Sequence, residues 1–488
     1  MSIKNNIYKA EVLHQQGNYK ESSEICEKLL SKKANLFDAL QIQGLNFKAQ
    51  GQFTEAINYF ERALKVKELH ACTHNNLGNT YLALQDFKRA SQYYSKALSI
   101  EPLLPQANNN LGICFVKLSN SENAEKYYRK AILLDPTIAD FHLNLGIVLT
   151  DRGAFSEASD FLLKALTLDA SKTAVYWYIF KIQMYLHRYI DALEIADSAL
   201  LSHSLNEQEL CELLIGKAMV YWLFFRYEEA DQAILLSEKI YEFEHESASM
   251  ANMVIFHRYI KRLLKQKKES SNLYFTGDDQ TQSLPELYFL SESHGFAPNG
   301  TVVEYQGTQY QVNSLFVLGA KLFHLIDTQE NQFQVSVSKV LDGLPINSKI
   351  VLGFGEIDCR YNEGIYTHCL KSGADFHQVI DDMVNRYLKM IKDISNAYQI
   401  DIIIYGVPAP HSYYVEKLKE VEQTNFKNLI AYFNQALERE CKNYSVSFLD
   451  VYQLTNDNGL SNLKYNIDVN HLVPKTVPEL FERLCKNV

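Results

Sequence analysis

The sequence lacks long apolar runs, and it lacks cysteines in paired motifs. No stretch approaches the roughly 20 consecutive apolar residues of a membrane-spanning helix, and residues 1–22 contain no apolar segment of the secretory type. The eight cysteines include no Cys-x-x-Cys pair, the spacing typical of zinc and redox motifs. We therefore expect a cytoplasmic protein with free thiols, no membrane span, and no metal or other cofactor.

An excess of positive charge is also absent. The 488 residues include 48 Lys and Arg against 58 Asp and Glu, which gives a net charge of -10. A protein that binds duplex nucleic acid usually presents a basic face, so we expect no nucleic-acid partner. Hydrophobic residues make up 47% of the chain, a globular composition, and the length is too great for one hydrophobic core.

Small residues recur with a fixed period of 34 positions in the first half of the chain. The recurring residues are Gly44, Gly78, Gly112 and Gly146; Ala56, Ala90, Ala124, Ala158 and Ala192; and Ala63, Ala97, Ala131, Ala165 and Ala199. Such residues allow two helices of a hairpin to approach closely, and apolar residues at helical spacing fill the space between hairpins. One hairpin cannot bury its own apolar face, so the period predicts a stack of helical hairpins.

The repeat resembles the tetratricopeptide repeat (TPR), a helix–turn–helix unit. The segments 77–102, 111–136 and 145–169 carry the strongest resemblance, with weaker units at 6–39, 172–203 and 208–241. The resemblance implies an all-α superhelix over residues 1–245, whose concave face binds a protein or peptide partner. A generic helical bundle is the alternative.

Asparagines recur on the first helices of these units. They are Asn75, Asn76, Asn109, Asn110 and Asn144. An amide side chain both donates and accepts hydrogen bonds, so these residues are candidates for a ladder that holds a peptide backbone. The alternative is a solvated inner face without a ligand.

The hydrophobic pattern changes after a helix and polar linker predicted at residues 246–284. Short apolar runs at 287–290, 349–354, 401–407 and 446–451 then alternate with helical segments. This alternation predicts an α/β domain at 285–488 with a mostly parallel sheet. Residues 301–312, which include Gly307, predict a hairpin, and residues 474–487 predict a closing helix.

Residues with reactive side chains follow three of the predicted strands. Ser293 and His294 come after the first strand, Glu356, Asp358 and Arg360 after the second, and Asp468 and His471 after the last. Because working residues of α/β sheets lie at the carboxyl ends of strands, we expect these side chains to form one site.

This arrangement resembles the SGNH (GDSL-like) hydrolase superfamily over residues 285–488. In that family a serine block follows the first strand, and an Asp-x-x-His block lies near the end of the domain. Ser293-His294 and residues 468–471 match these blocks in the right order. The resemblance implies a three-layer, flavodoxin-like α/β fold and an esterase or acyltransferase. Ser293 is then the nucleophile, His471 the base, and Asp468 the residue that orients the base.

The sequence departs from this family pattern at two blocks. Ser291 and Glu292 stand where the family has glycine and aspartate, and Ile357 stands where it has the asparagine that donates to the oxyanion. Gly319 is the candidate for the family's glycine donor.

Four charged or titratable residues near the expected site have two interpretations. Glu356, Asp358, Cys359 and Arg360, which follow one apolar strand, form either a substrate clamp or a structural ion-pair cluster, and His294 is a further candidate for substrate binding. Cys359 ranks below Ser293 as a nucleophile because no histidine is close to it in sequence.

Our leading hypothesis is an esterase or O-acyltransferase whose solenoid recruits a target that bears a glycan or an acyl ester. The alternative is a non-enzymatic adaptor that has kept the fold and lost the chemistry, with Ile357 as its best support. A glycosyltransferase is less favoured, because the second domain is short for two nucleotide-binding lobes and no phosphate-binding glycine loop is evident.

Overall fold

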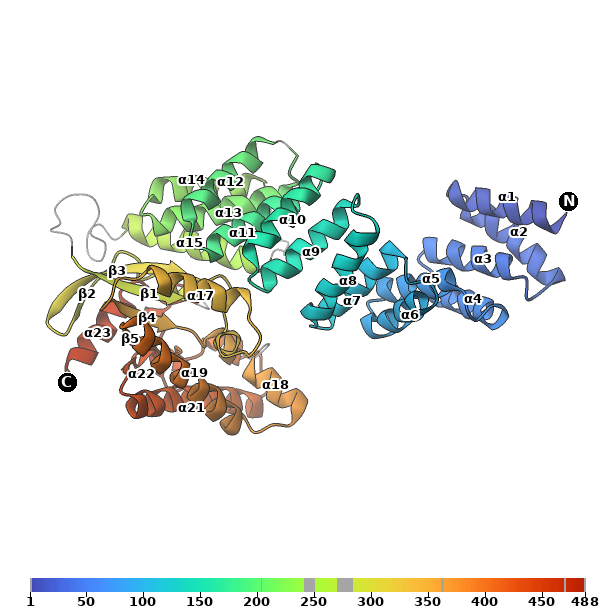
Figure 1. Cartoon of the computed structure of the whole chain (residues 1–488). Helices are drawn as coiled ribbons and strands as arrows, with labels where there is room; N and C mark the ends of the chain where they lie inside the picture. The colour runs from blue at the N-terminus through green and yellow to red at the C-terminus, as the bar shows by residue number, and fades with distance from the viewer. Residues whose placement is uncertain are drawn as a thin grey trace. The chain divides into compact units, whose positions relative to one another are not determined.

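The chain forms two compact units, Met1–Val175 and Tyr176–Val488. The computed structural model describes residues 2–202, 204–240, 251–269, 284–360, 364–468 and 471–486. About fifteen helices come first in the chain, and a mostly parallel sheet with further helices follows (Figure 1). Within the described residues, no helix is both long and apolar enough to cross a membrane.

Helical hairpins make up the first unit, as the 34-residue period predicts. Consecutive helices contact each other along the whole unit. The helices are α1 (Ile3–Gln15), α2 (Tyr19–Lys32), α3 (Phe37–Ala49), α4 (Phe53–Val66), α5 (Ala71–Ala83), α6 (Phe87–Ile100), α7 (Pro105–Lys117), α8 (Ser121–Leu134), α9 (Ala139–Asp151) and α10 (Phe155–Leu168).

The recurring glycines lie where an aromatic ring of the second helix meets the first helix of the same hairpin. A Cβ atom added to Gly78 would come within 2.6 Å of the Tyr94 ring, and Gly112 has the same relation to Tyr128. Tyr94 is fully buried. This confirms that the small residues permit close approach of the paired helices.

Asparagine amides join the first helices of successive hairpins. Asn110 Nδ2 donates to Asn79 Oδ1 at 3.0 Å, and Asn144 Nδ2 donates to Asn109 Oδ1 at 2.9 Å. The hydroxyl of Tyr94 donates to the same Asn79 oxygen at 2.7 Å. Several of these amide groups therefore bond to one another, and their role in holding a peptide remains a prediction.

The second unit begins with helices that continue the repeat. The predicted units at 172–203 and 208–241 correspond to α11 (Ala174–Tyr185), α12 (Tyr189–Leu201), α13 (Glu207–Leu223) and α14 (Tyr227–Ile240). The helix predicted next is α15 (Ala251–Glu269), which contacts both α13 and α14. Residues 270–283 of the predicted linker lie outside the described residues, and the predicted domain boundaries remain predictions.

A six-stranded sheet follows, in the order β2-β3-β1-β4-β5-β6. All neighbouring strands are parallel except the pair β2–β3. The predicted runs and hairpin are present as β1 (Glu286–Ser291), β2 (Val302–Tyr305), β3 (Thr308–Phe316), β4 (Lys349–Gly353), β5 (Asp401–Tyr405) and β6 (Ser447–Leu449). Gln306 and Gly307 in the hairpin turn both have positive φ, as a type I′ turn requires.

Helices bury the sheet. The longest are α17 (Gln332–Gly343), α19 (Phe376–Tyr398), α21 (Glu420–Tyr444) and the predicted closing helix α23 (Thr476–Lys486). Leu287, Phe289 and Val351 share a core with Leu480 and Phe481 of α23, while α19 and α21 contact each other and reach β5 and β6. Burial of the strands on both faces explains their nearly continuous apolar sequences.

The helices α11–α15 and the sheet share one hydrophobic core. Phe256 of α15 packs against Phe296 and Phe316, which flank the carboxyl end of β1. The indole of Trp222 donates to the Phe296 carbonyl at 2.8 Å, and Asn299 Nδ2 donates to the Leu223 carbonyl at 3.1 Å. The last helices of the repeat are therefore part of the α/β unit.

Replacing Gly78 with alanine should destabilise the first unit. The new Cβ would meet the buried Tyr94 ring at 2.6 Å, and overpacking of this kind costs about 1–3 kcal/mol. The measurement is urea unfolding of the full chain followed by circular dichroism. Gly343→Ala is the control because a Cβ atom added there would meet no other atom within 4 Å. Equal stability of both variants would contradict the close approach.

Acidification should destabilise the second unit through the partly buried His187. Its ring nitrogens contact the Tyr189 hydroxyl at 2.9 Å and the Ser336 hydroxyl at 3.1 Å, and burial lowers its pKa to about 4. The pKa of a histidine in the unfolded chain is about 6.5. Between pH 4 and pH 6.5 the unfolded chain therefore binds more protons than the folded chain. The stability contribution is therefore complete above pH of about 6.5 and is lost as pH falls toward 4.

The variant His187→Gln tests this titration. We expect a shallower loss of urea stability between pH 7 and pH 4.5 than in the wild type, since the amide does not titrate in this range. Replacement of the exposed His377 by Gln is the matched control. A pH slope unchanged by His187→Gln would refute the assignment.

Candidate active site

The structure brings together the three residues that the sequence predicts as a triad. Ser293 Oγ lies 2.9 Å from His471 Nε2. The other ring nitrogen of His471 lies 2.9 and 3.0 Å from the two carboxylate oxygens of Asp468, and the His471 backbone N–H donates to Asp468 Oδ1 at 2.8 Å. The geometry is that of a nucleophile, a base and an orienting carboxylate in series.

The position of this group follows from the sheet topology. The five parallel strands in chain order are β1, β3, β4, β5 and β6, so their spatial order reads 2-1-3-4-5. The order reverses between β1 and β4, which is where doubly wound sheets bind ligands. Ser293 begins the 3₁₀ helix η1 (Ser293–Phe296) directly after β1, and Glu356 follows β4.

Glu292 contacts Ser293 from a second side. Its Oε2 accepts short hydrogen bonds from both the backbone N–H and the hydroxyl of Ser293. The single hydroxyl proton therefore has two acceptors, Glu292 and His471. The backbone N–H of Ser293 is therefore already engaged.

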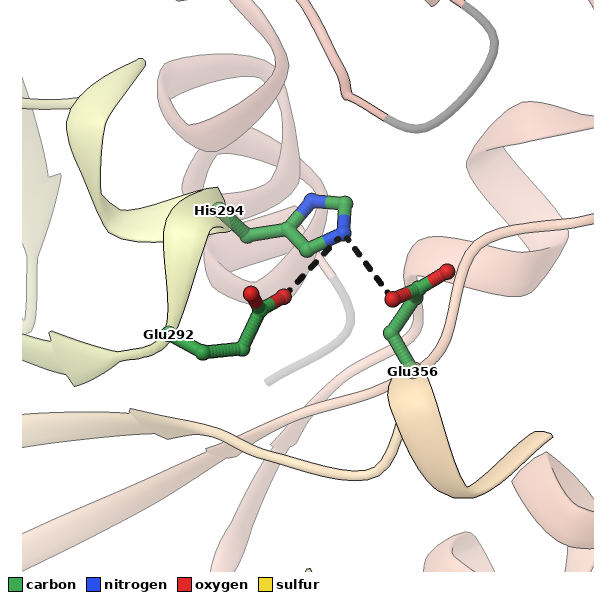
Figure 2. Close-up of side chains that lie close together, drawn as sticks. All are labelled: Glu292, His294 and Glu356. Carbon is green, nitrogen blue, oxygen red and sulfur yellow. Dashed lines mark ion pairs between the residues drawn. The ribbon is translucent and has the colours of Figure 1, made fainter. Parts of the chain in front are cut away.

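A second cluster consists of Glu292, His294, Glu356 and Arg360, and Figure 2 shows the first three of these side chains. His294 Nε2 is 3.6 Å from Glu292 Oε1 and 3.9 Å from Glu356 Oε2. Arg360 Nε lies 3.1 Å from each oxygen of Glu356, and its Nη2 lies 2.7 Å from Oε2. The two predicted residues Glu356 and Arg360 thus form a forked ion pair.

Opposing effects set the protonation of this cluster. Burial disfavours the charged form of His294, but the Glu356 and Glu292 carboxylates outweigh it and raise its pKa. Burial likewise disfavours the Glu356 carboxylate, but Arg360 and His294 outweigh it and hold its pKa well below the usual value.

Asp358 lies in the 3₁₀ helix η2 (Ile357–Cys359) after β4 and contacts the segment that follows β3, where Gly319 lies. Both Asp358 oxygens accept backbone hydrogen bonds, from Leu322 at 2.7 Å and Phe323 at 3.2 Å. Burial outweighs these bonds and raises its pKa to about 6. Gly319 has φ +72° in that segment, and its role as an oxyanion donor remains a prediction. Burial, followed by the Asp358 and Glu356 charges, raises the pKa of Cys359 well above its usual value, which disfavours a thiolate.

Helix α15 contributes two contacts that the sequence analysis missed. The Tyr259 ring stacks on His471 with centroids 3.7 Å apart and an interplanar angle of 6°. Arg262 Nη1 lies 3.7 Å from Asp468 Oδ2 and donates to the Ile467 carbonyl at 3.4 Å. Residues three apart share a helix face, so one face of α15 supports both partners of the serine. No local sequence signal indicates this.

Ser293, His471 and the covering Tyr259 are buried. Ser293 is 3% exposed, and both His471 and Tyr259 are 0% exposed. A ligand would therefore reach the Ser293 hydroxyl only after the covering side chains move.

Comparisons with known proteins identify the repeats. Two models described as tetratricopeptide repeat match residues 38–102 and 105–138. No curated protein matches the chain.

Solved structures of repeat proteins are similar to parts of the chain. MamA has 19% identity and a TM-score of 0.32, and the match covers 35% of this chain and 97% of MamA. Pseudomonas aeruginosa pilF has 17% identity and a TM-score of 0.37, and the match covers 41% of this chain and 89% of pilF. A tetratricopeptide repeat protein from Parabacteroides merdae has 15% identity and a TM-score of 0.40, and the match covers 52% of this chain and 98% of that protein. On the two family matches, the first unit of this chain carries tetratricopeptide repeats.

Proposed function

We propose that the α/β part of the second unit is an SGNH-like esterase or O-acyltransferase, acting on a target that the tetratricopeptide repeats recruit. The observation that supports it most is the series Ser293, His471 and Asp468, joined by contacts of 2.9 to 3.0 Å. Such a series activates a hydroxyl that is otherwise a weak nucleophile. The sheet order, with the serine after the first strand, also favours this family.

In the proposed reaction Ser293 Oγ attacks the acyl carbon of an ester while His471 takes the hydroxyl proton. The bond between the acyl carbon and the alcohol oxygen breaks, and His471 returns the proton to the leaving alcohol. Water or an acceptor hydroxyl then attacks the acyl-serine while His471 takes its proton. The bond between the acyl carbon and Ser293 Oγ breaks, and His471 returns the proton to Oγ. Asp468 fixes the ring orientation and stabilises the imidazolium.

The oxyanion that forms during attack needs donors. The Ser293 N–H is one, and it becomes available when Glu292 releases it. Ile357 supplies no side-chain donor in place of the family's asparagine, and one missing donor typically costs about 10²–10³ in rate. We therefore expect slow turnover of small model esters.

A non-enzymatic adaptor is the second candidate. Three observations favour it: Ile357 replaces a donor, Glu292 occupies the serine N–H, and the triad is buried. In that case the repeats still bind a protein or peptide, while the α/β part serves as a scaffold.

Ser293→Ala should abolish the reaction and leave the fold intact. We expect wild-type protein to react with a fluorophosphonate probe at Ser293 and to hydrolyse short acyl esters. Because the nucleophile is lost, turnover in the variant should fall by at least about 10⁴-fold. Ser314→Ala is the matched control, since Ser314 is also buried and its hydroxyl has no hydrogen-bond partner in the described structure. Absence of both labelling and turnover in the wild type would favour the adaptor.

Changing Tyr259 should separate orientation of the base from substrate binding. Tyr259→Phe keeps the flat ring over His471 and should retain turnover within a few-fold. Tyr259→Leu keeps an apolar side chain but removes the stacking face, and we expect kcat to fall by about 10²-fold with little change in KM. Steady-state kinetics measures both constants, and circular dichroism checks folding. If Tyr259→Leu keeps wild-type kcat and KM, the Tyr259 ring contributes only to packing and does not orient His471.

A further inference from the structure

Three side chains near Ser293 point toward one another. The proposed acyl transfer does not require any of them to bind the substrate. They are Glu292 and His294, which follow β1, and Glu356, which follows β4 (Figure 2). One atom of each, a carboxylate oxygen or an imidazole nitrogen, lies within 4.8 Å of the other two. Two strands that are neighbours in the sheet therefore supply one convergent set of ligand atoms.

Two of these ligand atoms have unmet bonding capacity. Glu292 Oε1 and His294 Nε2 are both buried and have no hydrogen-bond partner, and the two side chains are only 4% and 5% exposed. Buried polar atoms nearly always have partners. Two buried atoms that lack hydrogen bonds, and that converge with a third ligand atom only through long ion-pair contacts, point to a ligand between them.

The spacing fits a cation better than a direct contact. The distances from His294 Nε2 to the two carboxylates are 3.6 and 3.9 Å, whereas a hydrogen bond from nitrogen to oxygen measures about 2.7–3.2 Å. Ligands of a tetrahedral zinc ion with bonds of about 2.0–2.2 Å lie roughly 3.4 Å apart. Small side-chain movements would therefore bring all three atoms into coordination range.

We propose that Glu292, His294 and Glu356 bind a divalent transition-metal ion of the zinc or manganese class. Imidazole suits zinc, and carboxylate suits manganese, so the mixed donor set selects this class over magnesium or calcium. The site provides three protein ligands and leaves a coordination position for water or a substrate oxygen, which is typical of catalytic zinc sites.

Arg360 is the outer partner of this site. It holds Glu356 through Nε and Nη2 and so fixes the orientation of that carboxylate, as partners of metal ligands commonly do. A carboxylate oxygen has two lone pairs, so Glu356 Oε2 can accept from Arg360 and still bind the ion.

Glu292 connects the ion to the nucleophile. Its Oε1 faces His294, while its Oε2 accepts the N–H and O–H of Ser293. A cation on Oε1 draws electron density from the carboxylate and weakens its hold on Ser293. This consequence rests on the proposed function, whereas ion binding itself does not.

Metal uptake by the full chain tests the site without any activity assay. Protein stripped with a chelator is dialysed against Zn²⁺ or Mn²⁺, and bound metal is measured by elemental analysis. We expect one tightly held equivalent and a rise in the melting temperature, with no comparable effect of Mg²⁺ or Ca²⁺. No uptake by the wild type would overturn the proposal and assign the cluster to a charged imidazole between two carboxylates.

Ligand variants locate the bound ion. His294→Ala and Glu292→Gln should each weaken affinity by more than about tenfold, the lower limit of what loss of an outer partner costs. The control His377→Ala removes an exposed histidine that pairs with Asp375 and should keep the affinity. Circular dichroism confirms that each variant folds. Undiminished binding in both ligand variants, or loss of binding in the control, would overturn the site.

Uptake and catalysis fail separately in these experiments. Metal uptake with no labelling of Ser293 supports the ion site and refutes the esterase. Labelling without metal uptake supports the esterase and refutes the ion site.

Discussion

The candidate active site depends on the contact between helix α15 and His471. His471 lies in an irregular segment after the last strands, so its own backbone is not part of a helix or strand that would fix the position of its ring. Asp468 and Ser293 bond its two nitrogens, and the Tyr259 ring covers its face at 3.7 Å. A flat side chain held at both nitrogens and on one face has little freedom to rotate. Helix α15, which follows the helical repeat, thus contributes directly to the geometry of the α/β site.

Most of the features that the sequence predicts arise from contacts between nearby residues, whereas the meeting of Ser293 with His471, 178 positions apart, followed from the hydrolase resemblance. Gly78 meets Tyr94 within one hairpin, so the 34-residue period is enough to predict how the two helices of a hairpin pack. The continuous apolar strands and the Asp-x-x-His block are also local. The parallel half of β3 escaped prediction because its buried and less buried positions alternate and the hairpin signal ended at residue 312. The Arg262 contact joins residues 205 positions apart, and no local pattern can indicate it.

Burial of charge at one end of the sheet constrains the site more than any single hydrogen bond. Charged groups are costly to bury unless they are paired. Arg360 pairs Glu356, backbone N–H groups satisfy Asp358, and His471 satisfies Asp468. After these assignments, Glu292 Oε1 and His294 Nε2 are the buried atoms without hydrogen bonds in this described cluster. The buried atoms without hydrogen bonds therefore lie together at one position, beyond the carboxyl ends of β1 and β4.

Glu292 decides between the two candidate functions. Ser293 has one hydroxyl proton, and both Glu292 and His471 lie in position to accept it. While Glu292 holds the hydroxyl and the N–H, His471 cannot take that proton and the oxyanion donor is engaged. An enzyme must weaken this hold during its cycle, and a cation bound to Oε1 would do so through the carboxylate. An adaptor has no such need, and in it the same carboxylate simply satisfies two buried donors.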